Sequence, residues 1–74
     1  MTRLPRTSAR ECISALERAG FAFQRQRGSH YIMRHQDSLL RVVVPLHDAL
    51  GPGMLRAILR DADLTPQQFI ELLR

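Results

Sequence analysis

Apolar residues recur at two different spacings along this chain, and the spacings predict its helices and strands. Between residues 8 and 19 they recur at helical spacing and form one stripe, which ends at Gly20. Ser8 and Glu11 stand three residues apart at the start of this stripe, as in a capping box. We therefore expect a helix over residues 8–19.

Apolar and polar residues then alternate over residues 21–26 and 30–35, which is typical of strands joined by a tight turn. A β-branched segment over residues 39–44 predicts a third strand, and Pro45 should end it. Because the connections are short, we expect the three strands to form an antiparallel sheet.

Two further helices are expected after the strands. Gly51 and Pro52 introduce a helix over residues 52–61, and Thr65-Pro66-Gln67-Gln68 is a second capping box that begins a short C-terminal helix. The predicted fold class is α+β: a helix, a three-stranded antiparallel sheet, a helix and a short final helix, in a single domain over residues 1–74. Helices packed on one face of such a sheet leave its other face open to solvent.

The composition favours a polyanionic partner. The chain has 74 residues and a formal net charge of +4, and all eleven of its basic residues are arginine. Arginine binds phosphate bidentately and stacks on bases, although a basic surface equally suits an acidic protein or a membrane. The single cysteine, Cys12, excludes an internal disulfide and a cysteine zinc site. No apolar segment is long enough for a membrane span or a signal peptide, so we expect a cytoplasmic protein.

The turn at Gly28-Ser29 delivers a histidine to the start of a strand, between arginines. Side chains alternate between the two faces of a strand. In one phase Tyr31 and Met33 face the core, and His30 and Arg34 share the open face. In the other phase the histidine and the arginine would be buried, and a buried unpaired arginine is costly. We prefer the first phase, which makes this stretch a candidate site.

The chain resembles the HicA toxins, also called the YcfA-like family, over nearly its whole length. The segments that carry the resemblance are Arg3-Leu4-Pro5, Ser8-x-x-Glu11, Leu16-Glu17-x-Ala19-Gly20-Phe21, Arg25-Gln26-x-Gly28-Ser29-His30, Arg34-His35, Val42-x-Val44-Pro45-x-His47, Leu50-x-Pro52-Gly53-x-Leu55-Arg56-x-Ile58-Leu59-Arg60 and Leu64-Thr65-x-x-x-Phe69. A Gly-Ser-His sequence alone would be a weak signal, but these segments in this order are specific.

The resemblance implies a fold similar to the double-stranded-RNA-binding domain and the cleavage of messenger RNA. It also implies that His30 is essential for toxicity and that an antitoxin of the HicB type neutralises the protein. Members of the family often carry Lys-Glu after the second histidine and Thr after Pro-Gly, where this chain has Asp48-Ala49 and Met54. These two departures affect the expected activity or selectivity and not the fold.

The residues of the candidate site suit RNA cleavage that uses the ribose 2′-hydroxyl as its nucleophile. Histidine is the residue type best suited to act as a general base or acid near neutral pH, so His30 is the candidate catalytic residue. Arg27 and Arg34 are expected to hold phosphates, and Gly28 and Ser29 to offer turn N–H groups. Arg25 completes the expected RNA-binding set. His35 and His47 are candidates for a second proton-transfer group by residue type only.

Two other readings stay open at this point. The chain could be an RNA-binding module without catalysis that uses the same open face, or a protein-interaction domain whose basic face binds an acidic partner. We expect neither a metal nor a cofactor, because no carboxylate pair lies near the histidines in sequence and His30 and His35 point to opposite faces of their strand.

Overall fold

The structure is a computed structural model that describes residues 3–74. Met1 and Thr2, at the start of the predicted domain over 1–74, lie outside this range. The N-terminal segment is anchored at two points, because Leu4 is buried and Thr7 pairs with Leu50 in an isolated bridge. It therefore packs beside the loop that precedes the second helix.

The first helix, α1, spans Ala9–Arg18 and confirms the helix predicted over 8–19. Its capping box is formed: the Glu11 N–H donates to the Ser8 hydroxyl oxygen at 3.1 Å, and the Ser8 N–H donates to the Glu11 carboxylate at 2.9 Å. Hydrogen bonding of the Glu11 carboxylate to the Ser8 backbone N–H and, to a smaller extent, to the Ser8 side chain lowers the pKa of Glu11.

The three strands form one antiparallel sheet in the order β1-β2-β3, as expected. Strand β1 spans Phe21–Arg27, β2 spans His30–His35 and β3 spans Arg41–Pro45. The third strand thus begins two residues later than predicted and includes Pro45. The late start has a local cause, since the Leu40 N–H donates to the Ser38 hydroxyl and Leu39, 89 % exposed, stays in the turn. A proline is tolerated at the end of β3 because β3 is an edge strand.

Two helices follow the sheet, in agreement with the sequence pattern. Helix α2 spans Pro52–Asp61, and α3 spans Pro66–Leu72. The second predicted capping box is also formed, with Thr65 as N-cap and Gln68 as its partner. Between the two helices, Asp63 has a φ of +58° and provides the left-handed residue that ends α2.

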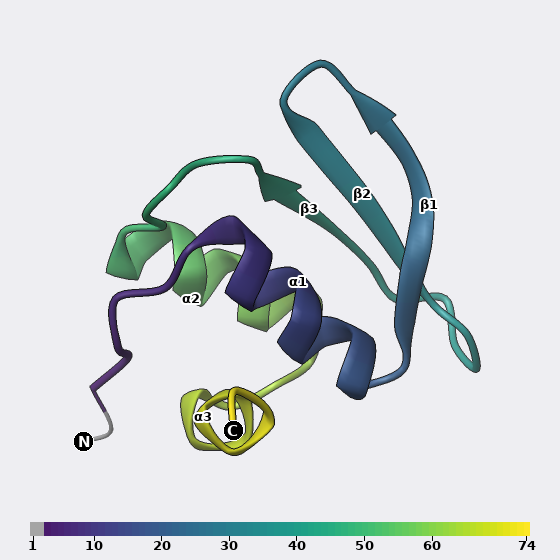
Figure 1. Cartoon of the computed structure of the whole chain (residues 1–74). Helices are drawn as coiled ribbons and strands as arrows, with labels where there is room; N and C mark the ends of the chain where they lie inside the picture. The colour runs from purple at the N-terminus through teal and green to yellow at the C-terminus, as the bar shows by residue number, and fades with distance from the viewer. Residues whose placement is uncertain (1–2) are drawn as a thin grey trace.

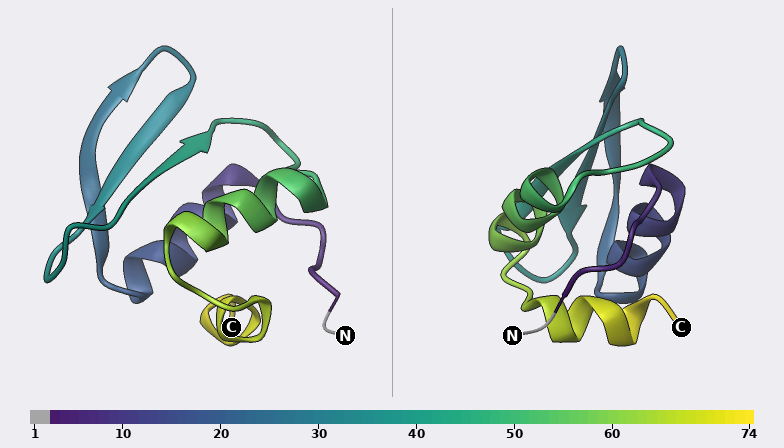
Figure 2. Two further views of the ribbon diagram at one scale, coloured as in Figure 1. Left: turned by 180° about the vertical axis from the view of Figure 1, so that it is seen from behind. Right: turned by 90° about the vertical axis from the view of Figure 1, so that its left-hand side faces the viewer.

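The helices all lie on the same side of the sheet (Figure 1). Helix α1 packs against β1 and β3, α2 packs against β3, and α3 packs against both other helices. Figure 2 shows α3 crossing the ends of α1 and α2 at one end of the molecule, while the turn between β1 and β2 projects beyond the helices at the other. The other face of the sheet, which we call the outer face, is covered by no helix of the described residues 3–74 (Figure 1).

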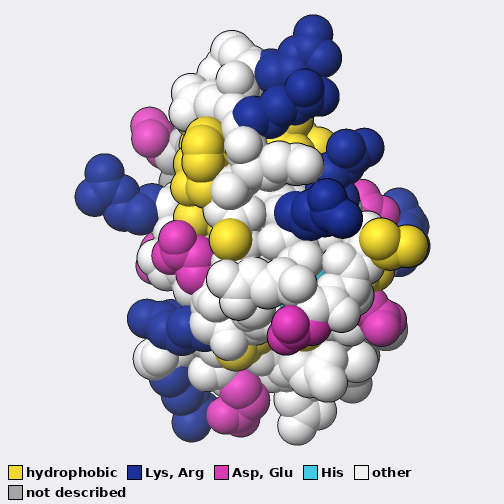
Figure 3. All heavy atoms as spheres, turned by 90° about the vertical axis from the view of Figure 1, so that its right-hand side faces the viewer, with side chains coloured by type: hydrophobic (Ala, Val, Ile, Leu, Met, Phe, Trp, Pro, Cys, Tyr) yellow, Lys and Arg dark blue, Asp and Glu magenta, His cyan; other side chains and the backbone are white. Residues whose placement is uncertain are grey.

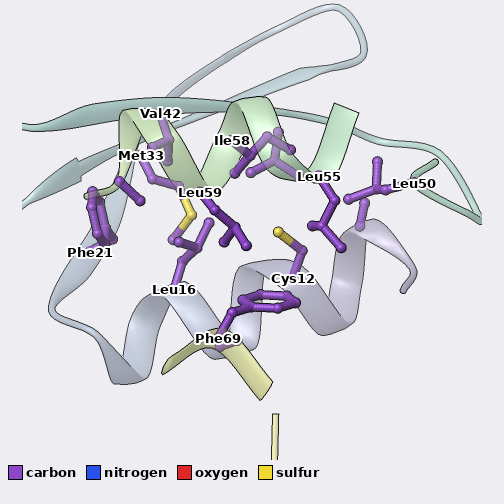
Figure 4. Close-up of a cluster of buried hydrophobic side chains, with 14 of the residues drawn as sticks. Cys12, Leu16, Phe21, Met33, Val42, Leu50, Leu55, Ile58, Leu59 and Phe69 are labelled. Carbon is purple, nitrogen blue, oxygen red and sulfur yellow. The ribbon is translucent and has the colours of Figure 1, made fainter. Parts of the chain in front are cut away.

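A single cluster of apolar side chains fills the space between the helices and the sheet (Figure 4). Phe69 of α3 lies fully buried next to Cys12 of α1, so the short last helix closes the end of the core. The side chains that are essentially inaccessible to solvent are those of Cys12, Ala15, Leu16, Met33, Val42, Val44, Leu55 and Phe69. This core holds β2 in place with one face against the helices and the other toward solvent.

Candidate functional site

The turn between β1 and β2 contains two residues, Gly28 and Ser29, because Arg27 pairs directly with His30. Gly28 has a φ of +56°, while Ser29 is not among the positive-φ residues, which is the pattern of a type II′ hairpin turn. Both turn carbonyls are occupied: the Gln26 side chain donates to the Gly28 oxygen at 3.0 Å, and the Leu46 N–H donates to the Ser29 oxygen at 2.8 Å.

The two turn N–H groups, in contrast, are free. Within residues 3–74, neither the Gly28 nor the Ser29 N–H donates in any of the turn and loop hydrogen bonds. Both residues are exposed, and among the described residues no heavy atom beyond the two chain neighbours of Gly28 lies within 4 Å of its Cβ position. The tip of the hairpin therefore presents N–H donors that an anion can approach.

The strand phase preferred from the sequence is confirmed. Met33 is fully buried and Tyr31 packs against the core, whereas His30 and Arg34 are exposed on the outer face. Ile32 shares that outer face and is nevertheless only 8 % exposed, because neighbouring side chains on the adjacent strands cover it.

A bulge in β1 determines where its arginines lie. The pairing register passes from Phe23 opposite Met33 to Arg25 opposite Ile32, so Gln24 is an extra residue. Strict alternation from Phe23 would turn Arg25 toward the helix side. The inserted residue shifts the alternation, and Arg25 and the following Arg27 join the outer face.

Residues paired directly across an antiparallel sheet share one face, so the register defines the outer face in detail. It carries three rows: Arg27–His30–Pro45, Arg25–Ile32–Val43 and Ala22–Arg34–Arg41. The arginine directly beside His30 is thus Arg27. Arg34 lies four residues along β2 from His30, which corresponds to about 14 Å at about 3.4 Å per residue.

The outer face is strongly basic, with an apolar strip in its middle. Four of the chain's eleven basic residues lie on it: Arg25, Arg27, Arg34 and Arg41. Val43, 42 % exposed, lies between them beside Ile32. Figure 3 shows the molecule from the right-hand side of Figure 1, where several arginine side chains gather in the upper part with hydrophobic groups exposed between them.

His35 has a structural role. Its Nδ1 accepts a hydrogen bond from the Asp37 N–H at 3.1 Å, so the proton of the neutral ring is on Nε2, which donates to the Ala19 carbonyl oxygen at 3.1 Å. The ring also makes an edge contact with Phe21, with 5.0 Å between centroids. His35 therefore connects the end of α1 to the turn after β2, and its nitrogens are occupied.

His47 lies closer in the fold to His30 than His35 does. It follows Leu46, whose N–H bonds the turn carbonyl of Ser29, and Pro45, which pairs with His30 itself. Its backbone carbonyl accepts from the Ala9 N–H at 3.0 Å, while its exposed ring forms no side-chain hydrogen bond within the described residues.

The positions at which the chain departs from the family pattern are on the surface. Asp48 is exposed and lines a hollow of about 360 Å³ with His47, Leu46 and the start of α1. Met54, 39 % exposed, is in the first turn of α2, where Gly51 caps the helix without a side-chain hydrogen bond. Neither residue is buried in the core, which agrees with the expectation that they do not affect the fold.

The described residues show neither a metal cluster nor a membrane span. No group of three or more His, Cys, Asp or Glu side chains within residues 3–74 is placed to hold a metal ion. In that same range, every helix is too short or too polar to cross a membrane.

The arrangement combines a free imidazole, free N–H donors and a guanidinium at one corner of a basic surface. Such a corner can exchange a proton with a bound hydroxyl and hold a phosphate. Sequence reasoning did not include Arg41 or Gln24 in this surface. Arg41 joins it through the register of β3, and Gln24 through the bulge, and neither feature has a clear signal in the sequence.

A comparison with known families identifies the chain. The family model described as the HicA toxin of bacterial toxin-antitoxin matches residues 9–64 of the 74-residue chain, which includes α1, the whole sheet and α2. No curated protein gives a significant match. Because the family model covers well over half of the sequence, the chain belongs to the HicA toxin family of bacterial toxin–antitoxin systems.

Proposed function

We propose that this protein is a metal-independent endoribonuclease that cleaves messenger RNA in the cytoplasm, with His30 as its catalytic residue. The observation that carries the proposal is the position of His30, exposed at the corner of the outer face, next to the free N–H groups of the turn and directly opposite Arg27. Membership of a toxin family supports a toxic, ribonuclease-type role.

In the proposed reaction, the ribose 2′-oxygen attacks the adjacent phosphorus and the bond from phosphorus to the 5′-oxygen breaks. The products are a 2′,3′-cyclic phosphate and a 5′-hydroxyl. Neutral His30 takes the proton of the 2′-hydroxyl. Arg27 and the N–H groups of Gly28 and Ser29 stabilise the charge on the phosphate oxygens. General acid–base catalysis contributes about 10²–10⁴-fold, so this site suits a slow nuclease.

The departing 5′-oxygen needs a proton, and His47 is our candidate for the group that supplies it. His35 is engaged at both nitrogens, whereas the His47 ring is exposed on the segment that begins beside His30. In this proposal, Arg25 and Arg34 bind phosphates of the same RNA strand farther along the outer face.

Membership of a toxin–antitoxin family implies a partner antitoxin, and we propose that it is of the HicB type. The outer face has the features such a partner would use, because exposed Val43 shares this face with four arginines. An acidic protein with apolar side chains at the centre of its interface would match this surface in charge and in hydrophobicity. Binding there would also cover His30 and so block the proposed reaction.

A non-catalytic RNA-binding module is the second candidate. The observation in its favour is that Arg34 and Arg41 lie at the end of the outer face away from His30, where they serve binding and not chemistry. The two candidates differ in one respect: the nuclease cleaves the RNA that it binds, and the binding module does not.

Chemically modified RNA distinguishes the candidates. An oligoribonucleotide should be cut to products with 2′,3′-cyclic phosphate and 5′-hydroxyl ends, and 2′-deoxy substitution at the cleaved nucleotide should stop cleavage without loss of binding. Products with 5′-phosphate ends would refute the proposed mechanism. Binding of both RNAs without turnover would favour the non-catalytic module.

A further inference from the structure

Two arginines stand directly opposite each other at the end of the outer face away from His30. Arg34 of β2 pairs with Arg41 of β3, and both side chains are exposed. Like charges directly opposite on an antiparallel pair destabilise a sheet. In the described part of the chain, neither guanidinium takes part in a side-chain hydrogen bond. The pair therefore has unused donors and a repulsion that a bound anion would relieve.

The two arginines line a cavity of about 440 Å³. The other residues of its wall are Gln24, Leu39, Leu40 and Asp61. Gln24 is the inserted residue of the bulge, and it adds an amide N–H₂ group to the ten guanidinium N–H donors of the pair. Leu39, 89 % exposed, adds an apolar surface at the rim. Donors for an anion and an apolar wall for a sugar or base thus meet in one cavity.

The distance from His30 decides what this cavity can bind. Arg34 is about 14 Å along the strand from His30, at about 3.4 Å per residue. Side chains stand roughly perpendicular to a sheet, so over this distance His30 and the Arg34–Arg41 pair are placed to contact different phosphate groups. Any phosphate at the pair therefore belongs to a different nucleotide from the one that is cleaved.

We propose that Arg34 and Arg41, with Gln24, form a second phosphate subsite that holds the RNA strand away from the cleaved bond. The inference rests on the proposed function in one respect, namely that the outer face binds RNA. The subsite contributes to substrate binding, and through it the protein favours RNA long enough to reach from the hairpin tip to the far end of the sheet.

Asp61 gives the subsite a feature that can be tested by itself. Asp61 lines the same cavity as the two arginines, and its carboxylate would repel a phosphate while it can accept a hydrogen bond from a ribose hydroxyl. Two positive groups against one negative group leave the cavity basic. Asp61→Asn removes the repulsion and keeps the size of the side chain, so it should tighten RNA binding.

The experiment measures the binding and cleavage of single-stranded oligoribonucleotides by Arg41→Ala, Arg34→Ala and Asp61→Asn. Arg56→Ala is the matched control, because Arg56 is an exposed arginine of α2 and its loss changes the net charge equally. Far-UV circular dichroism confirms that each variant is folded. Binding is measured in the His30→Ala background over a series of salt concentrations. Cleavage of a dinucleotide and of a longer RNA is measured with His30 present.

We expect Arg41→Ala and Arg34→Ala each to weaken binding of the longer RNA by about 10-fold, because each variant loses about one charge-assisted hydrogen bond to the RNA. The salt slope should fall by about 0.7 for each phosphate that the variant no longer neutralises. In both arginine variants, the preference in kcat/KM for the longer RNA over the dinucleotide should also fall about 10-fold, because KM for the longer RNA rises. Asp61→Asn, in contrast, should tighten RNA binding.

Equal effects of Arg41→Ala and Arg56→Ala would overturn the proposal, since only net charge would then matter. A loss of cleavage that is the same for the dinucleotide and the longer RNA would also overturn it. If no protein cleaves RNA but the binding and salt effects are as expected, the nuclease proposal fails and the phosphate subsite stands. If the wild-type protein binds no RNA, both fail.

Discussion

Gly20 connects the end of α1 to β1, and its replacement by alanine should be unusually destabilising for two separate reasons. Its φ of +99° is in the left-handed region, which disfavours any residue with a Cβ atom. In addition, a Cβ atom at this position would lie 2.8 Å from Nε2 of His35, the atom that donates to the Ala19 carbonyl oxygen. The substitution therefore strains the backbone and displaces His35.

The two effects can be given magnitudes. The left-handed conformation costs about 1–2 kcal/mol for a non-glycine residue, and loss of the His35 hydrogen bond adds about 1 kcal/mol. Further steric strain brings the expected total to about 2–4 kcal/mol. The stability of a 74-residue domain is about 4–11 kcal/mol. At about 4–8 °C per kcal/mol, Gly20→Ala should lower Tm by about 8–32 °C.

Two other glycines provide matched controls. Gly28 also has a positive φ, +56°, but in residues 3–74 no heavy atom beyond its chain neighbours lies within 4 Å of its Cβ position, so Gly28→Ala should show only the backbone cost of about 1–2 kcal/mol. Gly53 lies in α2 without a positive φ and with open space around it, so Gly53→Ala should stabilise the protein by up to about 1 kcal/mol.

Thermal and urea unfolding of the three variants, followed by circular dichroism, test this order. The double variant that combines Gly20→Ala with His35→Ala isolates the contact between the added methyl group and the His35 ring. Without the ring, Gly20→Ala should lower the free energy of unfolding by less. If Gly20→Ala and Gly28→Ala were equally destabilising, or if His35→Ala did not alter the cost at Gly20, the role assigned to the contact would be wrong.

Three further predictions concern the core, a helix end and the site. Burial raises the pKa of the Cys12 thiol from 9.0 to about 12, so the folded protein holds this proton more tightly than the unfolded chain. The contribution of this thiol to the free energy of unfolding is fully present below pH 9, and it falls by about 1.4 kcal/mol per pH unit as the pH rises toward 12. Urea titrations should detect this fall, and Cys12→Ala should lack it. Asp63→Gly should raise the free energy of unfolding by about 1 kcal/mol, because the φ of +58° suits glycine; a lower Tm would contradict this. Arg27→Ala should reduce kcat/KM for RNA by at least about 10-fold, since Arg27 lies opposite His30, and an effect no larger than that of Arg56→Ala would show that its position is unimportant.

The elements predicted from the sequence were those determined by local chemistry. Both capping boxes, Ser8 with Glu11 and Thr65 with Gln68, form the expected reciprocal hydrogen bonds. Residues three apart can signal such a cap because both partners lie within one turn of helix. The phase of β2 was also predictable, because only one phase keeps Arg34 out of the core.

The features that escaped prediction depend on contacts between distant segments. The bulge at Gln24 is one extra residue in β1, and the chain there alternates as any strand does. Arg41 is opposite Arg34 only because of the register of β3, which the turn around Ser38 and Leu39 sets. Both determine how many arginines share the outer face, and neither can be obtained from the spacing of residues alone.

Cleavage of a mixed-sequence RNA by the purified protein and by His30→Ala, each with and without EDTA, tests the central claim most directly. Both proteins must first be shown to be folded, which is expected because His30 is exposed and outside the core. The proposed mechanism predicts cleavage by the wild type that EDTA does not affect, and a loss of about 10²-fold or more in His30→Ala. Cleavage by folded His30→Ala at the wild-type rate would contradict the assignment of His30 as the catalytic residue.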